Sequence, residues 1–185
     1  MLRCFIAVNI DEEVRKRLVE AQGKLAATGA DVKLVEPQNI HVTMKFLGDV
    51  AESKVAEIVE ALKRGAQGTG QFDVGVKKIG VFPNLSYIRV VWAGVEEGRN
   101  ELVDIQRKID VELRPLGFQP ERDFVPHLTL ARVRTARSKE RLASFVKENA
   151  GADFGVTRAM AVELKQSTLT PKGPIYSTLA RVEFV

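Results

Sequence analysis

Two short phrases in the chain carry residue types that could move protons. The chain contains two histidines, and each opens a phrase of the same pattern, His41-Val42-Thr43-Met44 and His127-Leu128-Thr129-Leu130. The second and fourth residues of each phrase are apolar, which is the period-two alternation of a half-buried strand. One histidine on a strand is more often a hydrogen-bonded structural residue than a catalyst, but the repeated phrase favours a shared chemical role.

These residue types point to acid–base chemistry. A histidine has an unperturbed pKa of about 6.5, so near neutral pH one ring can accept a proton while another donates one. The hydroxyls of Thr43 and Thr129 lie about 7 Å along the strand from each histidine, share its face and could donate hydrogen bonds to an oxygen that gains negative charge in the reaction. Because the two phrases are nearly symmetric, they do not show which histidine is the acid and which is the base.

The same residues make a poor metal site. Two histidines supply only two ligands, no His or Cys remains as a third, and neither phrase contains a carboxylate. The chain also lacks a Gly-rich phosphate-binding loop and the lysine signature of a nucleotidyl-transferring ligase. We therefore expect a reaction that needs neither a metal nor another cofactor.

The elements that must position these phrases form an α+β pattern. Apolar periodicity and turn residues predict eight strands, at Leu2–Val8, Val32–Val35, Ile40–Phe46 (stopping at Gly48-Asp49), Phe72–Val81, Tyr87–Trp92, Val125–Val133, near Phe154–Gln166 and Ile175–Phe184. They also predict four helices, one after the capping and acidic residues 9–13 that runs through Leu25, and the others at Ser53–Arg64, Asn100–Leu113 and Lys139–Asn149. A turn is expected over Phe82–Ser86.

The order strand, helix, His-strand, helix, strand occurs twice with similar spacing. The first copy starts near Phe5 and its last strand near Phe72; the second starts near Ile88 and its last strand near Phe154. This indicates an internal duplication, with halves of roughly 1–86 and 87–185. Two lobes related by a pseudo-twofold axis would place the His-strands face to face across a cleft. The alternative is a single irregular α+β sheet.

The residues around the two phrases resemble a known family. The segments Arg3-Cys4-Phe5-Ile6-Ala7-Val8, His41-Val42-Thr43-Met44-Lys45-Phe46-Leu47-Gly48 and Pro126-His127-Leu128-Thr129-Leu130-Ala131-Arg132 carry the resemblance. They are similar to the bacterial and archaeal RNA 2',3'-cyclic phosphodiesterases of the two-histidine (2H) phosphoesterase superfamily, also called LigT-like proteins or 2'-5' RNA ligases. The resemblance runs from the first strand to the last.

This resemblance implies both a fold and a reaction. The fold would have two pseudo-symmetric lobes, each an antiparallel sheet with helices on its outer face, around a central cleft. The reaction would be metal-independent hydrolysis of an RNA terminal 2',3'-cyclic phosphate to a 2'-phosphate, with reversible 2'-5' RNA ligation as a second activity to test. By resemblance, His41 would be the general acid toward the leaving 3'-oxygen and His127 the general base toward water.

Four further residues are candidates for binding the substrate. By resemblance Arg132 binds the phosphate end, although strict alternation from the second phrase would turn it to the opposite face, so this role requires a twist, a bulge or a strand end. Phe46 has the equivalent place after the first phrase and is either a base-stacking residue or a core aromatic. Lys45 is in phase with the first phrase and could bind phosphate. Tyr176 resembles a tyrosine of unassigned role that recurs in the family.

The charge balance favours an anionic partner. The net charge is +4, and fixed positive charge attracts phosphate-bearing ligands. The most basic stretch begins beside the second phrase and comprises Arg132, Arg134, Arg137, Lys139 and Arg141. It could attract an RNA backbone without sequence preference, or it could be a solvated helix start. RNA ends or small cyclic-phosphate nucleotides are the expected partners.

Length and composition indicate one globular domain over residues 1–185. The 185 residues are 45% apolar and 28% charged, which is typical of a globular protein with a single core. The lone Cys4 cannot form an internal disulfide. The run Leu2–Val8 is too short and too polar for a signal sequence or a membrane span. We expect a cytoplasmic protein with no membrane partner, and a monomer.

Three alternatives remain at this stage. The substrate could be a small cyclic phosphate, such as a cyclic nucleotide, rather than RNA. The protein could be an RNA-binding module without catalysis, which the charge favours and the paired His-Thr pattern does not. The physiological reaction could be the joining of RNA ends rather than hydrolysis.

Overall fold

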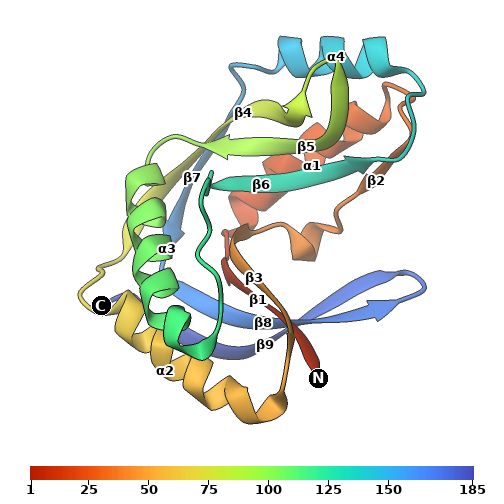
Figure 1. Cartoon of the computed structure of the whole chain (residues 1–185). Helices are drawn as coiled ribbons and strands as arrows, with labels where there is room; N and C mark the ends of the chain where they lie inside the picture. Colours follow the sequence, from red (N-terminus) through yellow and green to blue (C-terminus); the bar gives the residue numbers. More distant parts are fainter.

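The computed structural model describes residues 1–185, which form four helices and one nine-stranded sheet (Figure 1). The helices are α1 (Glu12–Ala26), α2 (Val55–Ala66), α3 (Arg99–Leu113) and α4 (Lys139–Glu148). The strands are β1 (Leu2–Val8), β2 (Val32–Leu34), β3 (Val42–Val50), β4 (Phe72–Asn84), β5 (Tyr87–Val95), β6 (His127–Val133), β7 (Asp153–Ala159), β8 (Ala161–Thr170) and β9 (Gly173–Glu183). Every predicted helix and strand is present, but the segment near Phe154–Gln166, predicted as one strand, forms two, β7 and β8.

The sheet is symmetric about its centre. Its strand order is β7-β4-β5-β6-β3-β1-β8-β9, with β2 paired to β6, so β3 corresponds to β6, β1 to β5, β8 to β4 and β9 to β7. The two central strands are joined at one residue pair, Val42 with Leu128. We call β3, β1, β8 and β9 the His41 lobe, and β6, β5, β4, β7 and β2 the His127 lobe. The predicted two-lobe α+β fold is confirmed.

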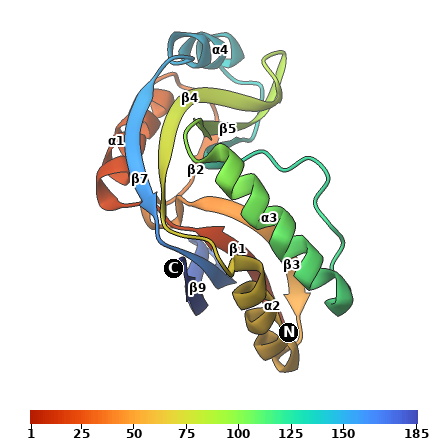
Figure 2. The ribbon, with the colours of Figure 1, turned by 90° about the vertical axis from the view of Figure 1, so that its left-hand side faces the viewer.

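Two helices cover each lobe. In the His41 lobe, α2 and α3 contact each other, α2 contacts β8 and β9, and α3 contacts β3. In the His127 lobe, α1 contacts β6 and β7, and α4 contacts β4. Figure 2 shows these two helix pairs on their separate lobes. Beneath them, 38 buried apolar side chains form one cluster that includes both Val42 and Leu128.

The lobes do not coincide with the two halves of the sequence. Strand β4 of the first half pairs with β5, and β8 of the second half pairs with β1. The boundary near residue 86 therefore falls inside the His127 lobe, in the β4–β5 hairpin. The strand near Phe154 is β7, which pairs with β4, and the structural counterpart of β4 is β8. Spacing along the chain could not show this, because it does not specify which sheet edge a strand joins.

Both motif strands contain a β-bulge at the fourth residue of the His-x-Thr-x phrase. Along β3 the pairing with β1 skips Met44, and along β6 the pairing with β5 skips Leu130. An extra residue in one strand shifts the alternation that follows it. The buried pairs Met44-Lys45 and Leu130-Ala131 are the result.

The bulge in β6 is supported by side-chain and backbone donors. The carbonyl oxygen of Leu130 accepts hydrogen bonds from the buried side chain of Gln22 (Nε2, 2.9 Å) and from the backbone N–H of Val35 (2.9 Å). Gln22 lies on α1, whose first turn is capped by Asp11, which accepts a hydrogen bond from the N–H of Val14 at 2.9 Å. The packing of α1 on the His127 lobe therefore helps to hold the bulge.

Several predicted strands end too early, among them β5, which continues to Val95 rather than ending at Trp92. Strand β4 continues to Asn84 and leaves only two residues between β4 and β5, where the side chain of Asn84 accepts hydrogen bonds from the N–H groups of Ser86 and Tyr87 (3.0 Å each). Pro83 is tolerated because it lies at an irregularity in the pairing. Strand β3 continues through Gly48 to Val50, because Gly48 adopts a positive φ of 70° beside a second irregularity. None of the four helices is long and apolar enough to span a bilayer.

Candidate active site

The single pairing between β3 and β6 places both phrases on one surface. Because Val42 lies opposite Leu128 in an antiparallel pair, the same register puts His41 opposite Thr129 and Thr43 opposite His127, and opposed residues share a face. Val42 and Leu128 are 1% and 0% exposed on the core side. The two histidines and two threonines line one cavity of about 380 Å³ on the other side. Tertiary structure thus brings together the four residues that the pattern selected.

His41 is enclosed by aromatic rings and hydrogen-bonded to the hydroxyl of Thr43. Its Nε2 lies 2.9 Å from the Oγ1 of Thr43. Its ring stacks on Phe5, with centroids 5.1 Å apart and planes at 20°, and lies 5.6 Å from the ring of Tyr176. The stacking restricts the imidazole to one orientation in the cavity.

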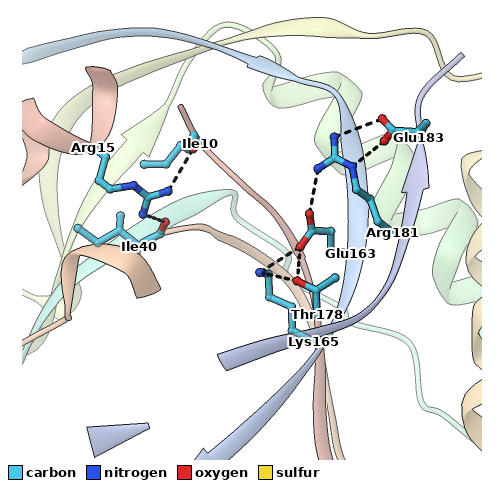
Figure 3. A network of polar contacts seen from close by, with 8 residues as sticks. All are labelled: Ile10, Arg15, Ile40, Glu163, Lys165, Thr178, Arg181 and Glu183. Carbon is cyan, nitrogen blue, oxygen red and sulfur yellow. Dashed lines mark hydrogen bonds and ion pairs between the residues drawn. The ribbon is translucent and has the colours of Figure 1, made fainter. Parts of the chain in front are cut away.

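An arginine from the opposite lobe holds the chain just before His41. The guanidinium of Arg15, on α1, donates to the carbonyl oxygens of Pro37 (2.6 Å), Ile40 (3.2 Å) and Ile10 (3.1 Å), and Figure 3 shows the last two contacts. Since α1 packs on the His127 lobe, the bonds to Pro37 and Ile40 connect that lobe to the segment that enters β3.

A charge network is built around the buried carboxylate of Glu163 (Figure 3). The carboxylate of Glu163, on β8, pairs with Lys165 at 3.0 Å and with Arg181 at 3.0 Å, and accepts a hydrogen bond from Thr178 at 2.9 Å. Burial, followed by the positive charges of Lys165 and Arg15, lowers the pKa of His41 to about 4, against a smaller upward effect of Glu163. His41 is therefore neutral in the unliganded protein at neutral pH.

His127 is held through its backbone contact. Its Nδ1 lies 2.7 Å from the carbonyl oxygen of Val125, and because a carbonyl only accepts, Nδ1 carries the proton. The Nε2 of the neutral ring then has a free lone pair. Burial lowers the pKa of His127, more than the bond to Val125 raises it, and Arg132 lowers it further.

Aromatic rings also surround His127. The rings of Phe82 and Trp92 lie 5.0 and 6.2 Å from the imidazole. Trp92 can lie flat across the neighbouring strand because residue 80 is glycine; a Cβ there would be 2.2 Å from the indole ring. Each histidine thus has its own aromatic enclosure, supplied by different elements.

The bulges decide where the residues after each phrase point. Arg132 lines the cavity, because the bulge at Leu130 restores it to the face of His127 and Thr129. Phe46 also lines the cavity and is 67% exposed, which excludes the core alternative for this ring. Tyr176, from β9, lines the cavity as well.

The phase prediction for Lys45 was wrong. Because Met44 is the extra residue of the bulge, Lys45 turns to the core side and is only 4% exposed. Its ammonium group pairs with Asp110 of α3 at 2.7 Å and donates to the carbonyl oxygen of Gln119 at 2.6 Å. Although Lys45 borders the cavity, its charge is committed to these two partners.

Sequence reasoning missed Lys33. This residue of β2 lies directly opposite Arg132 of β6, and both line the cavity. Neither takes part in an ion pair, and like charges directly opposite one another in a sheet repel. The pair therefore suits an anion held between the two side chains. No sequence motif marks Lys33, because the β2–β6 pairing joins residues a hundred positions apart.

The rim of the cavity also includes the β8–β9 hairpin, which projects from the His41 lobe in Figure 1. The buried side chain of Asn39 donates to the carbonyl oxygen of Pro174 at 2.9 Å. This bond ties the hairpin to the segment before His41. The structure brings together no group of three or more His, Cys, Asp and Glu side chains that could hold a metal ion.

Comparison with known proteins gives a consistent family. Residues 8–92 and 94–176 match the model of the LigT like Phosphoesterase family. A protein of Methanothermobacter thermautotrophicus named RNA 2',3'-cyclic phosphodiesterase is 43% identical over 178 residues, which cover 96% of this chain and 96% of that protein. One of the same name from Thermotoga maritima is 37% identical over 186 residues, covering 99% and 96%.

Solved structures share the fold. A crystal structure of a Thermus thermophilus protein has a TM-score of 0.82 at 28% identity, covering 98% of this chain and 97% of that one. The crystal structure of E. coli LigT complexed with 3'-AMP has a TM-score of 0.81 at 23% identity, covering 100% and 98%.

Proposed function

This chain belongs to the LigT-like phosphoesterase family, and we propose that it hydrolyses the terminal 2',3'-cyclic phosphate of RNA to a 2'-phosphate and a free 3'-hydroxyl. The observation that carries this proposal is the cavity in which two His-Thr pairs, one from each lobe, face the same space. Its volume of about 380 Å³ is in the range of cavities that hold small ligands. A nucleotide end can therefore enter it.

In the proposed reaction His127 is the general base. Its Nδ1–H donates to Val125, so Nε2 can take the proton of the attacking water. The water oxygen forms a bond to phosphorus as the bond from phosphorus to the 3'-oxygen breaks. The lowered pKa of His127 keeps this ring neutral at neutral pH.

His41 is then the general acid that protonates the leaving 3'-oxygen. The unliganded ring has a pKa of about 4, and an anionic phosphate beside it would raise that value, because a nearby opposite charge favours the protonated form. Thr43 and Thr129 donate to the non-bridging oxygens, whose negative charge grows in the transition state. After turnover the two rings return to their starting states by exchange with solvent.

Three further cavity residues bind the substrate in this proposal. Arg132 and Lys33, facing each other across β2 and β6, hold the phosphate from the side of the His127 lobe. Phe46, exposed beside Phe5 with ring centroids 6.3 Å apart, stacks on the terminal base. This places the sugar-phosphate between the lobes and the base at the His41 rim.

The test is product analysis with an oligonucleotide that ends in a 2',3'-cyclic phosphate. We expect a 2'-phosphate product, turnover unchanged by EDTA, and a kcat about 10² to 10⁴ lower for His41→Ala or His127→Ala. The melting temperatures of both variants should stay close to that of the wild type. Undiminished turnover in the double variant would falsify the two-histidine mechanism.

Two further assays separate the alternatives. A panel of nucleoside 2',3'-cyclic monophosphates and cyclic-phosphate oligonucleotides, compared by kcat/KM, distinguishes a small-molecule enzyme from an RNA-end enzyme. Supplying 2',3'-cyclic-phosphate and 5'-hydroxyl RNA halves, and searching for a 2'-5' linkage, tests ligation. Salt-sensitive RNA affinity without hydrolysis of any substrate would favour a binding module.

A further inference from the structure

A second, basic groove lies beside the candidate site. It is a cavity of about 250 Å³ between the tip of the β4–β5 hairpin and the start of α4. We define the basic groove by five of its lining residues: Tyr87, Arg89, Arg134, Arg137 and Lys139. The first two lie on β5, the next two follow β6, and the last begins α4.

The charge of this groove is uncompensated. Its lining contains four basic side chains and no carboxylate, and all four are exposed. None of them takes part in any of the ion pairs that the protein forms. Like charges gathered around one hollow repel one another and create a local positive potential. An anionic ligand would relieve this repulsion.

The groove lies next to the histidine cavity at the ends of two strands. On β5, Val90 lines the histidine cavity and Arg89 lines the groove; after the bulge in β6, Arg132 lines the cavity and Arg134 the groove. Two residues of a strand span about 7 Å. A ligand that leaves the cavity beside Arg132 reaches the groove by passing over the ends of these strands.

The groove also offers a surface for a base. Tyr87 is 62% exposed at the hairpin tip, and an exposed aromatic ring beside a basic groove is the arrangement on which single-stranded nucleic acid stacks its bases. A simple anion would contact the basic side chains but not the ring of Tyr87. The combination therefore fits a polynucleotide strand better than a free phosphate.

We propose that the basic groove binds the RNA chain on the 5' side of the terminal cyclic phosphate, while the end itself occupies the histidine cavity. This inference rests on the proposed function and extends it to a second contact site, which binds the RNA chain outside the histidine cavity. The contacts are to backbone phosphates and one stacked base, so binding has little sequence preference.

The test compares two substrates on matched variants. The groove variant carries Arg89→Gln, Arg134→Gln and Arg137→Gln; the control carries Lys16→Gln, Lys24→Gln and Lys108→Gln, three exposed residues without ion pairs on α1 and α3. Both lose three positive charges. The substrates are a nucleoside 2',3'-cyclic monophosphate and an octanucleotide ending in a 2',3'-cyclic phosphate.

We expect the groove variant to raise KM for the octanucleotide at least about tenfold and to leave kcat and KM for the mononucleotide unchanged. For the octanucleotide, the slope of log KM against log salt concentration should be smaller by about 2 in the groove variant than in the wild type. Each lost contact to a single-strand phosphate lowers this slope by about 0.7, and three arginines are replaced. Tyr87→Ala should raise the octanucleotide KM alone. The control variant should change little with either substrate.

An unchanged octanucleotide KM in the groove variant, or an equal rise in the control, would overturn the groove and leave the proposed function standing. If the wild-type protein hydrolyses neither substrate, the proposed function fails. In that case fluorescence anisotropy with an octanucleotide ending in a 3'-phosphate still tests whether the groove binds RNA. Weaker binding by the groove variant than by the control would support it, and equal binding would refute it.

Discussion

His41 and His127 occupy equivalent positions on β3 and β6, but their surroundings differ. His41 is bonded to Thr43, stacked on Phe5 and close to the charges of Lys165 and Arg15. His127 is fixed by the carbonyl oxygen of Val125. The same phrase thus lies in two electrostatic environments, which can give two chemically identical groups different roles.

The residues after the two phrases differ more than the phrases do. The first residue after each bulge, Lys45 or Ala131, points to the core. The second residue after it, Phe46 or Arg132, points to the cavity. One lobe therefore presents a flat ring and the other a cation to the same ligand. The two lobes supply equivalent positions, and the different residues at these positions make them complementary.

The first prediction concerns Lys45, whose counterpart Ala131 carries no charge. Lys45→Met leaves Asp110 buried without its cation, and breaking a buried pair in this way costs about 3–5 kcal/mol of the free energy of unfolding. Urea denaturation measures the loss. KM of the folded variant should stay within a few-fold of the wild type, because the ammonium does not reach the ligand.

The double variant Lys45→Met/Asp110→Asn is the matched control for this change. It keeps the acceptor for the side chain of Gln106 and the N–H of Glu121, both at 2.7 Å, and removes the unpaired charge. It should be more stable than Lys45→Met. A large rise in KM for either variant would show that Lys45 contributes to substrate binding.

The second prediction compares the two hydroxyls. Thr129→Val removes a donor to the transition state and should lower kcat about 10²-fold. Thr43→Val should lower kcat at least as much, because it also removes the hydrogen-bond partner of His41. Only Thr43→Val should shift the titration of His41. Equal kcat losses with no change in that titration would remove the distinction between the lobes.

The third prediction concerns Arg15, which connects the lobes on the His41 side only. Arg15→Met loses two hydrogen bonds to carbonyl oxygens of the segment that enters β3 and one to Ile10. We expect kcat to fall about tenfold, since small misplacements of catalytic groups are costly. The pKa of His41 should rise, because a positive charge that lowers it is gone.

Arg17→Met is the control for this variant. Arg17 is an exposed arginine two residues further along α1 whose partner is Glu13. It should leave both kcat and the titration of His41 unchanged. If Arg15→Met behaves like this control, the hydrogen bonds of Arg15 have no role in positioning His41.

The fourth and smallest effect is a difference in titration. With only two histidines, the ring protons are resolved by NMR, and His127→Gln assigns them. Both should titrate below the usual value of about 6.5, with His41 near pH 4. Addition of a nucleoside 2'-phosphate should raise the pKa of His41, as the proposed acid role requires.

Folding stability should follow the same asymmetry. An unfolded histidine binds a proton below about pH 6.5, whereas folded His41 stays neutral until about pH 4, so the free energy of unfolding falls as the pH falls through this window. The variant His41→Gln loses this part of the pH dependence. A wild-type and variant pair with the same slope between pH 6.5 and 4 would contradict the depressed pKa.

The sequence by itself determined the local structure and the choice of site. Alternation in the two phrases indicated strands, and the period of two places His41 with Thr43 on one face of the first strand and His127 with Thr129 on one face of the second. Helix periodicity likewise gave all four helices to within two residues or so at each end. These features depend on neighbours within a few positions, which a single sequence displays.

Tertiary structure decided the rest. The bulges at Met44 and Leu130 reversed the expected faces of Lys45 and Arg132, the crossing of β4 and β8 separated the lobes from the sequence halves, and β2 brought Lys33 beside Arg132. Each depends on a pairing between residues far apart in the chain. Local periodicity describes how a strand alternates, but only the partner strand fixes where that alternation slips.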